Sequence, residues 1–237
     1  MTLVGCKQDM DNTKLAPYLY DYLPASVGHS VTYDVDSIGY NYIVGDTQIV
    51  TNVHYQLREV ILDSGNSVCL YQPGVTCYGV AEYKRYDTTQ PFPSNYLYWY
   101  FYLNKSTYVT NYQDLAFENF TFPPITGNTW LGNSLLPAND TIQDTYQPYA
   151  GWVYTYTSVN VPNTVNGHHF DSTAVVSDVN DTTNLVNDVF CTEIYARHVG
   201  LVFRQFEVIT KQGIFSSWAN PDSATGFRIK QWFHSSP

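Results

Sequence analysis

The chain has 237 residues, of which 44% are hydrophobic and 14% are charged, and its formal net charge is −10. This share of apolar residues excludes an intrinsically disordered chain, because their burial can offset the entropy that is lost on ordering. The excess of acidic residues excludes nucleic acids and anionic lipid surfaces as electrostatic partners, since both would be repelled.

The first six residues, Met1 to Cys6, read MTLVGC and are similar to a bacterial lipobox, in which the cysteine carries the lipid. A complete signal peptide has a charged segment and an apolar segment, and neither precedes Leu3 here. We therefore expect residues 1–5 to be the remnant of a lipoprotein signal peptide and residues 6–16 to be a tether. Residues 17–237 are then expected to form a single β domain, attached to a membrane through a lipid on Cys6.

Strand patterns dominate the chain from about residue 30 onward, and tyrosine, valine and threonine suit half-buried strands. Apolar and polar residues alternate with a period of two, as a strand with one buried face requires. The best segments are 31–36, 53–58, 96–103, 152–157, 199–210 and 227–230. In segment 199–210 we expect Arg204 and Glu207 to point toward solvent. Segment 114–119 is the best candidate for a short helix.

Turn residues separate these segments at regular distances, among them Pro73-Gly74 and Asn166-Gly167. Asn-Gly favours the positive backbone angles of tight hairpins. Apolar run 96–103 is far shorter than the roughly 20 residues that a membrane-spanning helix needs. The sequence therefore predicts an all-β fold with little helix, a single antiparallel β-barrel or β-sandwich of roughly ten strands.

Three cysteines remain besides Cys6, and two of them flank a turn. Cys69 and Cys77 lie on either side of Pro73-Gly74, where two strand ends can bring them to disulfide distance. The alternative is that both stay reduced. Cys191 lies in an apolar run and is expected to be a small buried residue. No CxxC motif or Cys/His cluster is present, so we predict no metal site.

Several phrases occur together in an order that is typical of one family. They are YDVDSI at 33–38, YQLRE at 55–59, EYKRY at 82–86, WLGN at 130–133 and EIYARHVGLV at 193–202. Across nearly its full length the chain resembles a family of uncharacterised lipoproteins of the Bacteroidota. The resemblance implies lipid attachment at Cys6 and a place in the cell envelope. It supplies no catalytic residues.

Two sets of polar residues are candidate metal ligands. His168 and His169 are adjacent, so on a strand they point to opposite faces and cannot both bind one ion. Asp178, Asp181 and Asp188 could offer oxygen ligands to calcium, but the segment lacks the glycine and the final glutamate of an EF-hand loop. Both groups are better explained as solvated loops.

Glu193 is the residue best suited to acid–base chemistry, since His198 lies close in sequence. No nucleophile can be placed beside it from sequence. The competing interpretation is a buried ion pair between Glu193 and an arginine such as Arg85 or Arg197. Trp130, in a Thr-Trp-Leu-Gly-Asn segment, is the tryptophan that packing explains least, and it is the candidate for aromatic contact with a ligand.

These patterns predict a non-enzymatic lipoprotein of the outer membrane whose β domain binds a ligand or an unknown protein or glycan partner. Two alternatives stay open: a hydrolase that acts on glycans or peptides, and a purely structural envelope module. No catalytic residue and no cofactor are predicted, and no nucleic-acid partner is expected.

Overall fold

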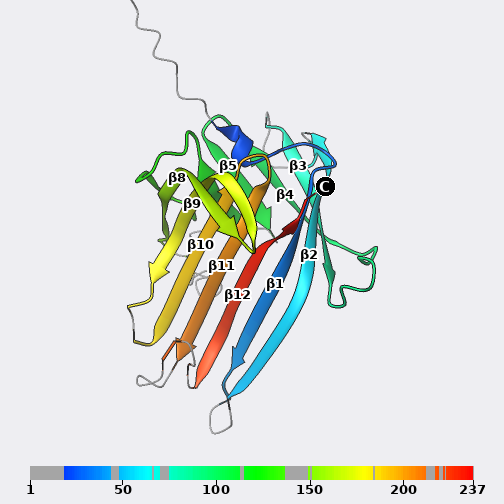
Figure 1. Cartoon of the computed structure of the whole chain (residues 1–237). Coiled ribbons are helices and arrows are strands. Elements are labelled where there is room, and N and C mark those ends of the chain that lie inside the picture. The colour runs from blue at the N-terminus through cyan, green and yellow to red at the C-terminus, as the bar shows by residue number, and fades with distance from the viewer. Residues whose placement is uncertain are drawn as a thin grey trace, which may run out of the picture.

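The computed structural model contains one antiparallel sheet of twelve strands that curls into a nearly closed barrel (Figure 1). It describes residues 19–43, 48–65, 67–69, 75–112, 115–136, 149, 151–183, 185–211, 217–218, 221 and 223–236. The longest helical element within these ranges is a single 3-10 turn, η1 (Tyr20–Tyr22), and no helix among the described residues is long and apolar enough to cross a bilayer. The predicted all-β class and the barrel alternative are confirmed.

The strands follow one another around the barrel with a single long-range step. They are β1 (Ser30–Asn41), β2 (Ile49–Gly65), β3 (Cys77–Arg85), β4 (Leu97–Leu103), β5 (Thr107–Tyr112), β6 (Leu115–Thr121), β7 (Thr129–Leu131), β8 (Val153–Val165), β9 (His168–Asp181), β10 (Asn187–Ala196), β11 (Gly200–Lys211) and β12 (Ala224–Ser235). The order in the sheet is β6-β5-β4-β3-β2-β1-β12-β11-β10-β9-β8-β7, so the first and last strands pair in the middle. Figure 1 shows the long strands β10 to β12, β1 and β2 side by side.

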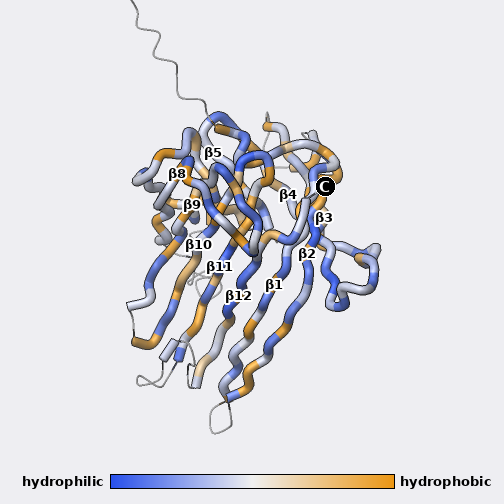
Figure 2. Tube along the Cα trace, viewed as in Figure 1, coloured by the Kyte–Doolittle hydropathy of each residue, from blue (hydrophilic) through white to orange (hydrophobic). Residues whose placement is uncertain are grey.

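Alternation of side chains decides which face of each strand is buried. In β1, Tyr33 and Val35 are 1% and 0% exposed, whereas Asp36 is exposed. Their register partners on β2 are Leu57 and Tyr55, which are also buried. The same alternation appears along several strands in Figure 2 as a change between hydrophobic and hydrophilic residues. A one-residue slip would turn this whole apolar face to solvent, so the alternation fixes the register.

The two edge strands of the sheet, β6 and β7, meet at a seam that side chains help to close. One backbone bond crosses it, from Glu118 N to Gly132 O at 2.7 Å. The Trp130 indole donates to Glu118 O at 2.6 Å. A Cβ on Gly132 would lie only 2.4 Å from the ring of Tyr154, so the close approach requires glycine. The seam thereby removes most of the exposed edge that an open sheet would leave.

Tyr156 of β8 completes the seam by replacing a missing pair of ladder bonds. Its hydroxyl donates to Thr121 O at 2.7 Å and accepts from Thr121 N at 2.9 Å. Its ring is fully buried and packs against Trp130 and Phe120.

The segment before β1 covers one end of the barrel (Figure 1). Tyr22 of η1 is fully buried, and its hydroxyl donates to Asn160 Oδ1 at 3.1 Å. The main-chain carbonyl of Asp21 accepts a hydrogen bond from the backbone N–H of His198 at 2.6 Å. Its carboxylate Oδ2 lies 3.4 Å from Arg197 Nε.

Three expectations about local structure are wrong. The predicted short helix at 114–119 falls mostly within strand β6. Asp178, Asp181 and Asp188 lie in β9 and β10 and not in a solvated loop, and Asp178 is 1% exposed. Arg204 faces the barrel interior and not solvent, while Glu207 on the opposite face is buried against Arg228 at 2.8 Å.

We predict that Tyr156→Phe lowers the free energy of unfolding by about 1–3 kcal/mol, because it leaves the Thr121 N–H and C=O without their partner. Chemical denaturation measures this. The matched control is Tyr86→Phe, at a tyrosine that is 65% exposed, and it should change stability by less than about 0.5 kcal/mol. Equal effects of the two substitutions would show that the hydroxyl does not hold the seam.

Candidate ligand-binding cavity

The barrel encloses a cavity of about 530 Å³. Side chains from nearly every strand line it, together with Leu23, Pro24 and His29 from the segment that covers one end. Lys84 lines the cavity and is also exposed to solvent, so it marks the mouth. The volume falls within the range of small-molecule binding pockets, roughly 300–1,000 Å³.

Aromatic rings form much of the cavity wall. Phe101 packs against Tyr108 with ring centroids 5.2 Å apart, and Trp99 lies 6.2 Å from Phe101. Trp152 and Tyr154 contribute from the strand across the seam. Such rings offer large apolar contact area together with polarised faces and edges. The wall therefore suits a ligand with an apolar or aromatic body.

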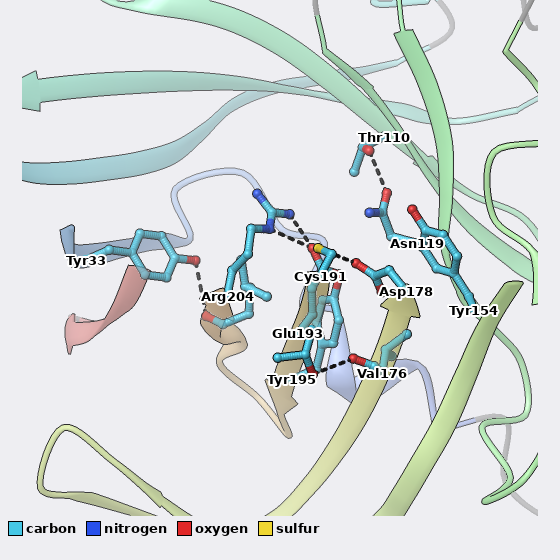
Figure 3. Close-up of polar contacts among 12 residues, drawn as sticks. Tyr33, Thr110, Asn119, Tyr154, Val176, Asp178, Cys191, Glu193, Tyr195 and Arg204 are labelled. Atoms are coloured by element: carbon cyan, nitrogen blue, oxygen red, sulfur yellow. Dashed lines mark hydrogen bonds and ion pairs between the residues drawn. The ribbon is translucent and has the colours of Figure 1, made fainter. Parts of the chain in front are cut away.

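An ion pair between Arg204 and Glu193 lies at the centre of the polar groups (Figure 3). The two residues are register partners on β11 and β10, and both guanidinium nitrogens Nε and Nη2 reach Glu193 Oε1, at 2.7 and 2.6 Å. The Tyr195 hydroxyl donates to the other oxygen, Oε2. The side chain of Glu193 is 1% exposed, but that of Arg204 is 35% exposed, because it borders the cavity. The carboxylate is therefore enclosed while the guanidinium remains accessible from inside.

Glu59 and Glu82 form a second polar group on the opposite wall. They are directly opposite each other in the ladder between β2 and β3, and both line the cavity. Burial raises the pKa of Glu59 to about 7, and the neighbouring Glu82 adds to the shift. Burial also raises the pKa of Glu82. The hydroxyls of Tyr33 and Tyr112 donate to Glu59 and Glu82, each over 3.5 Å. Glu59 therefore exchanges its proton near neutral pH.

Asp178 and Cys191 form a third polar pair, and both are kept neutral. Burial raises the pKa of Asp178 well above its usual range, and Glu193 raises it further. The Cys191 thiol donates to Asp178 Oδ2 at 2.8 Å (Figure 3), and burial raises its pKa too. A neutral thiol is a poor nucleophile, so Cys191 is a structural residue, as the sequence predicts.

Two β-bulges direct polar residues into the cavity. The register between β9 and β10 passes from Ser177 to Val179, which leaves Asp178 without a partner on β10. The register between β5 and β6 skips Asn119, whose side chain accepts from Thr110 at 2.6 Å. Bulges commonly re-aim a side chain next to a functional site.

Three cavity-lining residues have a buried polar atom with no partner among the residues that the structure describes. They are Trp99 Nε1, Asp178 Oδ1 and Gln231 Nε2. Since buried polar groups are almost always hydrogen-bonded, each such atom calls for an explanation, which a bound molecule would give.

Of the residues singled out from sequence, Asp178, Cys191, Glu193 and Arg204 line the cavity, and the others that the structure describes do not. Cys6 lies outside the described residues. Cys69 and Cys77 are joined in a disulfide with their Cα atoms 5.9 Å apart. Trp130 belongs to the seam and does not line the cavity.

The buried ion pair expected between Glu193 and an arginine is present, but the partner is Arg204 and not Arg85 or Arg197. Arg85 binds Gln56 at 2.6 Å, and Arg197 lies beside Asp21. His169 lies 3.4 Å from Asp171 on an exposed surface. In the described part of the chain, no three His, Cys, Asp or Glu residues are grouped as a metal site.

Sequence reasoning missed four cavity residues: Glu59, Glu82, Asp178 and Arg204. The sequence carries a signal for two of them, Glu59 and Glu82. Glu59 shares the strand parity of Tyr55 and Leu57, and a charged residue on an apolar face marks either a pair or a site.

Comparison with known proteins gives no family. No protein-family model matches the chain, and no curated protein matches it. The chain is similar to a solved structure from Bacteroides fragilis, of a protein with a YmcC-like fold that is inferred to be exported, with 9% sequence identity, a TM-score of 0.42 and coverage of 90% of this chain and 97% of that chain. It is also similar to a protein of Parabacteroides distasonis that is inferred to be a lipoprotein, with 8% identity, a TM-score of 0.37 and coverage of 91% and 98%.

Glu59 should make stability depend on pH. An acid whose pKa is raised by folding stabilises the folded state below its unfolded pKa, and this contribution is lost as pH rises through the folded value. With a shift from 4.5 to about 7, wild type should lose on the order of 2–3 kcal/mol relative to Glu59→Gln between pH 4.5 and 8. Denaturation at a series of pH values measures the difference. Asp171→Asn, at a side chain that is 99% exposed, should follow wild type. Parallel curves for wild type and Glu59→Gln would contradict the assignment.

Proposed function

We propose that this chain is a cell-envelope lipoprotein whose barrel binds a small amphipathic molecule and catalyses no reaction. The observation that carries the proposal is the cavity of about 530 Å³, with aromatic walls and a few polar groups that converge from different strands. Pockets of this size and composition are typical of small-molecule binding sites.

The disulfide between Cys69 and Cys77 supports export, because disulfides persist in oxidising compartments and are rare in the cytosol. The lipobox-like residues that end at Cys6 support a lipid anchor, and through it a membrane as partner. We place the protein at the outer membrane, where its ligand could be free or carried by a protein or glycan partner.

The two alternative functions explain the cavity less well. A purely structural module has no need of an interior that side chains leave unfilled. A hydrolase with Glu193 as acid–base group would need that carboxylate to be free to exchange a proton with substrate. Here Arg204 and Tyr195 occupy both of its oxygens.

Filling the cavity should abolish ligand binding without unfolding the barrel. Leu115 and Ile229 both line the cavity, so the double variant Leu115→Trp/Ile229→Trp narrows it. Binding of a neutral apolar fluorophore, N-phenyl-1-naphthylamine, is measured by the rise in its fluorescence. We expect saturable binding to wild type and a loss of at least about tenfold in affinity in the variant.

The control for this experiment adds the same bulk outside the barrel. Leu131 and Leu185 are 57% and 65% exposed, so Leu131→Trp/Leu185→Trp should bind like wild type. Circular dichroism shows whether each variant keeps its strands. Failure of wild type to bind the fluorophore saturably, or undiminished binding by the filled variant, would overturn the proposal.

Lipid attachment is tested in cells that express the native gene. We expect an alkyne-labelled fatty acid to be incorporated into the protein and to be lost in Cys6→Ser. Cys191→Ser should keep the label, because Cys191 is buried in the barrel. Label that persists in Cys6→Ser would place the lipid elsewhere or on no cysteine at all.

A further inference from the structure

The cavity holds more acidic than basic groups. Among the residues described, four carboxyl groups line it, those of Glu59, Glu82, Asp178 and Glu193, against the cationic side chains of Lys84 and Arg204. The Arg204 guanidinium is directed at Glu193. Glu59 and Glu82 therefore lie side by side, and in the described part of the chain neither forms an ion pair, although the charge of Arg204 partly offsets the rise in pKa that burial causes in each.

The wall around these two glutamates is suited to a positive charge. Tyr112 donates to Glu82 at 3.5 Å, and its ring lies 6.4 Å from that of Trp99. Aromatic faces attract cations within about 6 Å of the ring centroid. The barrel already has one such contact at its mouth, where Lys84 Nζ lies 3.6 Å from the centroid of Tyr55.

A second observation indicates that something is bound here. Trp99 is 9% exposed, Gln231 is 5% exposed and Asp178 is 1% exposed, and each has a polar atom without a partner among the described residues. All three line the same cavity as the glutamate pair. Unpaired polar atoms at this depth cost about 1–3 kcal/mol each, unless a ligand or water completes them. Trp99 Nε1 and Gln231 Nε2 are donors, so a ligand that completes them carries a hydrogen-bond acceptor as well as its charged group.

We infer that the cavity binds an organic cation, an ammonium group carried on an apolar body, with the charge placed beside Glu59 and Glu82. This inference rests on the proposed function and names the ligand class of the same site.

An anionic ligand fits the cavity less well. Two cationic side chains could attract it: Arg204, whose charge is already matched by Glu193 at 2.6 Å, and Lys84 at the mouth, whose ammonium lies over the Tyr55 ring. It would also meet the repulsion of any ionised group among Glu59, Glu82 and Asp178. A cation gains from the same carboxyl groups and needs no new partner from the protein.

Three probes with the same alkyl chain test the charge alone: decylamine, 1-decanol and decanoate. Trp99 and Trp152 line the cavity, so intrinsic fluorescence reports binding, and calorimetry checks it. At pH 8, above the pKa of about 7 of Glu59, we expect decylamine to bind at least about tenfold more tightly than decanol. Decanoate should bind more weakly than decanol.

Glu82→Gln removes one charge with little change of shape. It should weaken the binding of decylamine by about tenfold or more and leave the affinity for decanol unchanged. The exposed control Asp171→Asn should change neither affinity. Unchanged decanol affinity shows that the variant is folded.

The outcomes separate the two proposals. If all three probes bind equally, or if decanoate binds best, the cavity binds ligands but the cation assignment is wrong. If decylamine binds best but Glu82→Gln does not weaken it, the charge lies elsewhere and the assignment is also wrong. If none of the probes binds, the proposed ligand-binding function fails as well.

Discussion

The width of the barrel is the constraint from which the interior follows. Strand number sets barrel diameter, and about eight strands give an interior that side chains can just fill. This sheet has twelve strands, so even large aromatic residues from opposite walls leave space between them. The abundance of tyrosine and tryptophan is then a partial compensation, because these side chains reach furthest into the interior. The cavity is the part of the interior that these side chains do not fill.

A wide interior also changes the free-energy cost of burying polar groups. An isolated ionised group in a dry core would be strongly destabilising, but the Arg204 and Glu193 pair satisfies one charge with the other, and Tyr195 completes the carboxylate. The side chain of Arg204 keeps 35% of its surface accessible because it borders empty space. The cavity thus lets the Arg204 side chain lie inside the barrel without being fully enclosed by protein atoms.

Much of the fold could be predicted from the sequence, and the site could not. Alternation in β1 and β2 predicts the strands, and the predicted disulfide between Cys69 and Cys77 is present. Arg204 was misplaced for a physical reason. Between β10 and β11 the register passes from Phe203 to Leu201, so Val202 is a bulge that reverses which residues of β11 face inward.

Asp178 escaped prediction for the same reason, since it is itself the extra residue of a bulge in β9. A bulge depends on the partner strand and leaves no mark in the local alternation of one sequence. By contrast, Glu59 and Glu82 lie in regular register. The inward direction of Glu59 follows from Tyr55 and Leu57, and that of Glu82 from Val80 on its own strand. The predictable part of the site is therefore the glutamate pair.

The protonation state of each carboxyl group decides whether it can pair with a cation. A group whose pKa is about 7 loses its proton at neutral pH at almost no cost, and this is the value for Glu59. The pKa of Asp178 is raised well above its usual range, and each unit of that shift adds about 1.4 kcal/mol to the cost of ionising it. A positive charge that enters the barrel would therefore cause Glu59 to release its proton more readily than Asp178. The same burial that raises the pKa of Glu59 to about 7 therefore leaves this side chain ready to become anionic beside a cation.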